Sequence, residues 1–61
     1  MKPFVQLTGT DGNVFAIIGR VSGTLKSNNL KDQADEFIEK AFASGRYEEV
    51  IQLVSNYCEV G

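Results

Sequence analysis

The chain has 61 residues, of which 43% are hydrophobic and 23% charged, with six basic and eight acidic side chains and no histidine. This length predicts one domain over residues 1–61 with a small core, since a chain of about 60 residues buries only about 60% of its unfolded surface. The one cysteine excludes an internal disulfide, and four Cys or His ligands for a structural zinc ion are missing. Self-association is therefore the expected source of further stability.

The charge is unevenly distributed along the chain. Residues 1–31 hold four basic side chains and one acidic side chain, net +3, whereas residues 32–61 hold two basic and seven acidic side chains, net −5. Six basic residues are few for sequence-independent binding of nucleic acid, which is therefore not expected as a partner. No apolar run approaches a membrane span, and the first residues lack the apolar segment of a signal peptide. With one thiol, a cytoplasmic protein is expected.

The first predicted element is a strand at residues 4–8, "FVQLT", preceded by Pro3, whose missing N–H is tolerated at the start of a strand. Residues 13–28 allow two interpretations. Asp11-Gly12 is typical of a hairpin turn, after which "NVFAI" would be a returning strand. A helix is favoured, because apolar residues recur at helical spacing over three turns: Val14, Ile17, Ile18, Val21 and Leu25. Asp11 or Asn13 would cap this helix, and an Asn in "KSNN" would end it.

Two further helices are expected. The second has Asn29 and Asp32 as a weak capping pair and Gly45 as its left-handed end, and its apolar face comprises Leu30, Ala34, Phe37, Ile38, Ala41 and Phe42. The third begins near Glu48 and Glu49, where the helix dipole favours carboxylates. The tail "NYCEV" permits a short strand beside residues 4–8. The predicted fold class is α+β, mostly helical, in the order β-α-α-α with or without a closing strand.

Three stretches carry a resemblance: "LTGTDGNVFAIIGRV" at residues 7–21, an acidic helix, and "ASGRYEEVIQLVSNY" at residues 43–57. With these residues, and above all the central "DGNVFAIIG", the chain resembles a group of short proteins encoded by bacteria, phages and mobile elements. The resemblance implies a small accessory protein of phage or mobile-element type that binds a host protein, including proteins of defence systems. It implies no activity that is carried by particular residues.

The loop that precedes the first helix is a candidate ligand site, formed by Gly9, Thr10, Asp11, Gly12 and Asn13. Backbone N–H groups at a helix start attract anions, and Arg20 would supply a bidentate donor to a carboxylate or phosphate. The loop lacks the Lys and Ser/Thr of a phosphate-binding P-loop, and its glycine spacing does not match the dinucleotide fingerprint. The alternative interpretation, which is favoured, is a turn that starts and caps the helix.

Other residues indicate packing and not chemistry. Gly19 and Gly23 lie four apart inside the first helix, where each costs about 1 kcal/mol relative to Ala, so a close approach by another helix or a second subunit is expected there. Cys58 has no histidine to activate it and is expected to be buried. The paired acidic residues lie on expected outer faces, away from any cleft that would perturb their pKa values. The chain is therefore not expected to be an enzyme, and no cofactor or metal is expected.

The leading hypothesis is a protein-interaction or inhibitor module that dimerises and presents acidic helical faces to another protein. The carboxylates expected to contact that partner are Glu36, Glu39, Glu48 and Glu49, all within the strongly acidic second half of the chain. The alternative is a small-ligand or nucleotide-binding protein that uses the Gly9–Asn13 loop and Arg20, with the site at a dimer interface.

Overall fold

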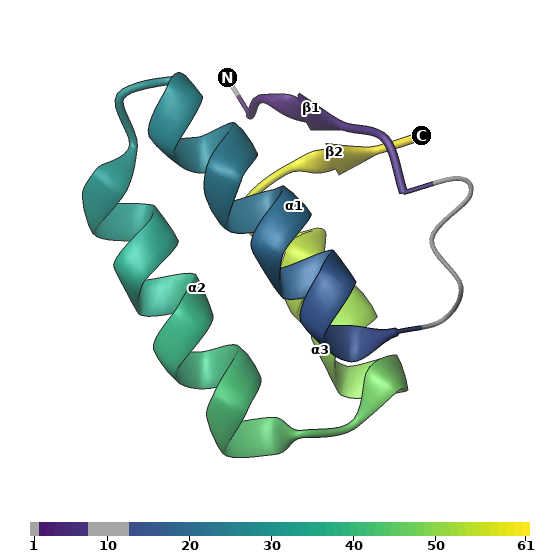
Figure 1. Cartoon of the computed structure of the whole chain (residues 1–61). Helices are drawn as coiled ribbons and strands as arrows, with labels where there is room; N and C mark the ends of the chain where they lie inside the picture. The colour runs from purple at the N-terminus through teal and green to yellow at the C-terminus, as the bar shows by residue number, and fades with distance from the viewer. Residues whose placement is uncertain (1, 8–12) are drawn as a thin grey trace.

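The computed structural model of the protein describes residues 2–7 and 13–61, and its elements follow the order β-α-α-α-β (Figure 1). Their bounds are β1 Phe4–Val5, α1 Val14–Ser27, α2 Lys31–Ser44, α3 Tyr47–Val54 and β2 Glu59–Val60. The predicted α+β, mostly helical fold is therefore confirmed, and the closing strand is present. The strand expected at residues 4–8 is shorter than predicted.

Helix α1 confirms the helical interpretation of the region after the glycine-rich loop. The side chain of Asn13 accepts a hydrogen bond of 2.9 Å from the backbone N–H of Phe15, which caps the helix as expected. At the other end, Asn29 has a left-handed backbone with φ of 62°. The N–H of Asn29 donates to the carbonyl of Lys26, and the N–H of Leu30 donates to the carbonyl of Leu25. These two bonds form a Schellman motif, which ends α1 sharply.

The start of α2 differs from the prediction. Asn29 does not cap this helix; Leu30 occupies the N-cap position and makes no side-chain capping bond. The physical reason is that the backbone of Asn29 is already committed to the left-handed turn that ends α1, while Leu30 packs against the core. The end of α2 is as predicted, because Gly45 has φ of 65° and its N–H donates to the carbonyl of Ala41.

The two strands pair in parallel, with Phe4 opposite Glu59 and Val5 opposite Val60. The N–H of Glu59 donates to the carbonyl of Pro3 at 2.8 Å, and the N–H of Gly61 donates to the carbonyl of Val5 at 3.1 Å. All three helices lie between these strands in the sequence, so the pairing joins the two ends of the described chain. This pairing also places Val5 in the core.

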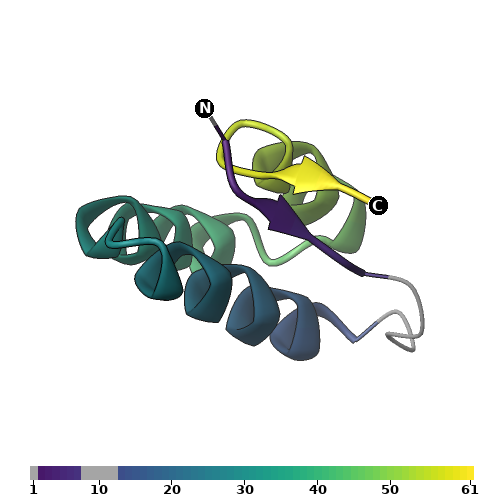
Figure 2. The same cartoon turned by 90° about the horizontal axis from the view of Figure 1, so that it is seen from above.

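The core lies between the antiparallel helices α1 and α2 and, on their inner side, α3 with the two strands (Figure 2). Its buried apolar residues come from every helix and from both ends of the chain: Val5, Ile17, Ile18, Val21, Leu25, Ala34, Phe37, Ala41, Val50, Val54, Tyr57 and Cys58. Four of the five residues of the predicted α1 stripe are buried, and Val14 is partly buried. Phe42, expected on the apolar face of α2, is instead 56% exposed.

Candidate protein-binding surface

The ligand loop predicted from the sequence is described only at its last residue. Gly9, Thr10, Asp11 and Gly12 lie outside the described residues, while Asn13 serves as the cap of α1. Arg20 lies on the flank of α1 that faces β1, and its Nη1 donates to the backbone carbonyl of Gln6 at 3.4 Å. Arg20 therefore links α1 to the N-terminal segment. Ligand binding by the loop and Arg20 stays a prediction.

The four candidate glutamates are exposed, but they occupy different surroundings. Glu39 lies on the outer side of α2, and Glu48 lies in the first turn of α3. Glu49, also in that turn, is 4.0 Å from Nε of Arg46, an ion pair between two exposed side chains. Such surface pairs contribute little to stability. Glu36 differs from the other three because it has contacts with both a tyrosine and a lysine.

Glu36 connects α2 to the turn that precedes β2. Its carboxylate accepts a hydrogen bond from the hydroxyl of Tyr57 and lies 3.4 Å from Nζ of Lys40. The hydrogen bond from Tyr57, followed by the positive charge of Lys40, lowers the pKa of Glu36 below its usual value. Burial, followed by the hydrogen bond to Glu36, raises the pKa of Tyr57. Sequence reasoning placed Glu36 among the residues free to meet a partner and missed this internal role, because Tyr57 is 21 residues away.

An apolar cleft that sequence reasoning also missed lies where the start of α1 meets the end of α2. Its volume is about 390 Å³, and its lining is mostly apolar: Asn13, Val14, Phe15, Ile18, Ala41, Phe42 and Gly45. The rings of Phe15 and Phe42 lie 5.9 Å apart, centroid to centroid, at an interplanar angle of 43°. Phe15 is 69% exposed, so both rings remain largely in contact with solvent. Helical spacing within one helix could not predict this aromatic pair, because its two rings come from different helices.

The two helices that line the cleft, α1 and α2, form one layer whose outer side is turned away from α3 and the strands (Figure 2). We call this surface the α1–α2 face. Helical spacing from the Phe15–Phe42 pair assigns these exposed residues to it: Phe15, Ala16, Gly19, Gly23 and Lys26 from α1 and Lys31, Asp32, Asp35, Glu39 and Phe42 from α2. A Cβ added at Gly19 or Gly23 would meet no atom within 4 Å. The close approach expected at these glycines is therefore not made by any described part of this chain.

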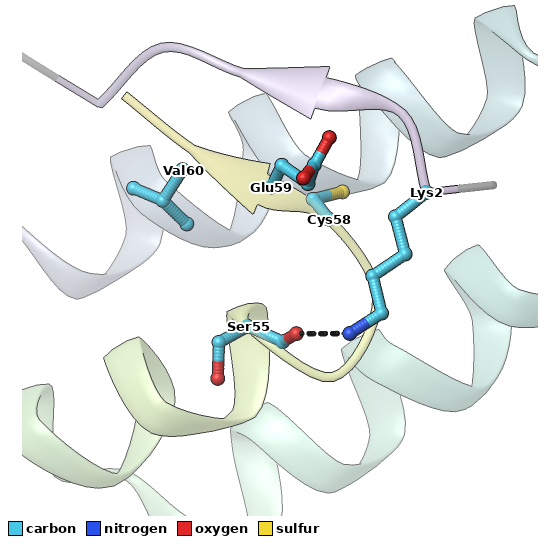
Figure 3. A pocket seen from close by; sticks show the side chains of 5 residues that line it. All are labelled: Lys2, Ser55, Cys58, Glu59 and Val60. Carbon is cyan, nitrogen blue, oxygen red and sulfur yellow. Dashed lines mark hydrogen bonds between the residues drawn. The ribbon is translucent and has the colours of Figure 1, made fainter.

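A second cavity, of about 700 Å³, lies beside β2 and is lined by Lys2, Ser55, Cys58, Glu59 and Val60. Lys2 reaches across it and donates from Nζ to the carbonyl of Ser55 at 2.9 Å (Figure 3). Cys58 is buried, as expected, and this burial raises the pKa of its thiol. A higher thiol pKa reduces the thiolate population, which makes Cys58 less nucleophilic than an ordinary cysteine.

Comparison with known protein families, with curated proteins and with solved structures finds no match to this chain. Within the described residues, no three His, Cys, Asp or Glu side chains are grouped so that they could hold a metal ion. None of the helices in residues 2–7 and 13–61 has the length and apolar character needed to cross a membrane. The function is therefore inferred from the exposed side chains and the clefts of the chain itself.

Proposed function

We propose that this protein is a non-enzymatic protein-interaction module and that the α1–α2 face is its binding surface. The observation that carries this proposal is the exposed pair of Phe15 and Phe42 beside an apolar cleft. Exposed apolar patches on small domains mark interaction sites, and aromatic side chains that fill pockets dominate the energy of protein interfaces. A partner that inserted an apolar side chain into this cleft would remove both rings from water.

The surroundings of the cleft favour a protein partner that has both apolar and charged side chains at its binding surface. Asp35, Glu39 and Phe42 are spaced i, i+4 and i+7 on α2, so the carboxylates continue along the same side of the helix as the exposed ring. An apolar anchor next to charged residues is the usual arrangement of an interface core and its rim. Of the four glutamates expected to contact a partner, Glu39 is the one that belongs to this face.

The resemblance to short phage and mobile-element proteins makes a host protein one class of partner, and a second copy of the chain is another. Both classes fit a surface without catalytic groups, where binding is the whole activity. Glu48 and Glu49, in the first turn of α3, lie outside the α1–α2 face and stay a prediction as partner contacts.

Photo-crosslinking in the producing cells tests the proposal directly. Phe15 is replaced by benzoylphenylalanine, a ring of similar placement that reacts with neighbouring C–H bonds under light. The matched control places the same group at Phe4, which is 57% exposed on β1 and lies away from the α1–α2 face. The proposal predicts a discrete crosslinked protein from position 15 and none from position 4. Absence of any protein adduct at position 15, or equal adducts at both positions, would refute it.

A further inference from the structure

We propose that the chain bound at the α1–α2 face is a second copy of this protein, with α1 of each copy packed against α2 of its partner. This inference rests on the proposed function, because it names the occupant of the same surface. Three features of the face argue for self-association: its area, the distribution of its apolar residues and the signs of its charges.

The area of the face is of the order that a stable dimer needs. Specific interfaces bury about 800 Å² on each partner, which is about one-fifth of the 4041 Å² that this chain exposes. Helices α1 and α2 have 14 residues each, so each is about 21 Å long and about 10 Å wide. Two such helices side by side cover a flat footprint of about 420 Å², about half of that value before the relief of their side chains is counted. Gly19 and Gly23 have no side chains to project from the α1 part of the face, so a partner helix can approach closely.

The apolar residues favour one particular arrangement of the two copies. Phe15 lies in the first turn of α1 and Phe42 in the last turn of α2, so both rings lie at the same end of the antiparallel pair. A twofold axis parallel to these helices lays α1 of one copy on α2 of the other and brings both aromatic ends together. The rings of Phe15 and Phe42 then meet the same two rings of the partner, and the four of them enclose both clefts.

The charges of the face are complementary under the same twofold axis. On this face, α1 carries the cation Lys26 and no acidic residue, whereas the outer side of α2 carries three carboxylates, Asp32, Asp35 and Glu39, against the single cation Lys31. Because the helices are antiparallel, the end of α1 lies beside the start of α2. Lys26 of one copy therefore approaches Asp32 and Asp35 of the partner's α2. A twofold axis perpendicular to the helices would instead place α2 on α2 and oppose like charges.

Reciprocal charge reversal tests this arrangement. One variant carries Lys26→Glu, and the other carries Asp32→Lys and Asp35→Lys. Sedimentation equilibrium is expected to give a dimer for the unmodified protein and a dimer dissociation constant raised at least tenfold for each variant alone, since like charges then face each other. An equimolar mixture of the two variants is expected to recover the dimer, because both contacts again join opposite charges. The matched control, Glu48→Lys with Glu49→Lys on α3, is expected to leave the dissociation constant unchanged.

Recovery on mixing also shows that each variant is folded, since an unfolded chain would not be rescued by its counterpart. A monomeric unmodified protein at all concentrations, or charge variants that dimerise as well as it does, would overturn the inference. A mixture of folded variants that stays monomeric would overturn it as well. If the protein is monomeric but crosslinks from position 15 to a different protein, only the identity of the occupant is wrong. If neither association nor crosslinking occurs, the proposed function fails too.

Discussion

Replacing both exposed glycines of α1 with alanine should stabilise the isolated chain. Each Gly→Ala change in a helix interior contributes about 1 kcal/mol, because glycine loses more backbone entropy on folding. The full increase in unfolding free energy is expected because there is room for the new side chains: an added Cβ at Gly19 or Gly23 meets no atom within 4 Å. The double change is therefore worth about 2 kcal/mol, or a rise in Tm of about 8–16 °C for a domain of this size.

The assay is urea denaturation followed by circular dichroism, at a protein concentration where sedimentation shows a monomer. A chain of this length has a total stability of about 3–9 kcal/mol, so a gain of about 2 kcal/mol is readily measured. Gly45→Ala is the control with the opposite sign, because its φ of 65° strains any residue with a Cβ. At concentrations that favour the dimer, the gain from Gly19→Ala with Gly23→Ala should shrink, as the added methyl groups separate the two copies. A monomer that is not stabilised would refute the open surface described for α1.

Three other outcomes are expected. Folding stability should fall as the pH drops below about 4.5, the usual pKa of a glutamate, because the pKa of Glu36 is lower in the folded chain than in the unfolded chain. The stability that this difference contributes is lost as the pH falls through the folded-state pKa. Tyr57→Phe should weaken this pH dependence in acid denaturation, and an unchanged profile would count against the contact between Tyr57 and Glu36. Asn13→Ala should lower the unfolding free energy by about 1 kcal/mol, and Asn13→Ser should restore most of it; equal losses in both would exclude capping. Cys58 should react with iodoacetamide only as fast as the chain opens, because the thiol is buried with a raised pKa; rapid alkylation under native conditions would contradict this burial.

Local patterns accounted for most of the fold. The spacing of Ile17, Ile18, Val21 and Leu25 correctly favoured a helix over a hairpin, since a strand would leave the last two without a reason to be apolar. The predicted N-cap of α2 was wrong for an equally local reason. One short connection had to end one helix and begin the next, and the backbone conformation of Asn29 served the first purpose.

The candidate site was harder to predict because it depends on contacts between helices. Phe42 fits the apolar stripe of α2 by spacing, yet it lies at the margin of that stripe and pairs with Phe15 outside the core. In the same way, Glu36 matches the acidic outer face of α2 but accepts a hydrogen bond from Tyr57, which lies in the turn before β2. Periodicity assigns a residue to one side of its own helix. It does not say which neighbouring element lies on that side.

Both proposals require the outer side of α1 and α2 to bind another chain, and the second requires that chain to be another copy of this protein. A concentration series of ¹H–¹⁵N NMR spectra tests this second requirement residue by residue. With increasing concentration, the amide signals of Phe15, Gly19, Lys26, Asp35 and Phe42 should shift together along one binding curve, while those of Phe4 and Glu48 stay fixed. Shifts centred on β1 or α3, or spectra that do not change with concentration, would contradict it.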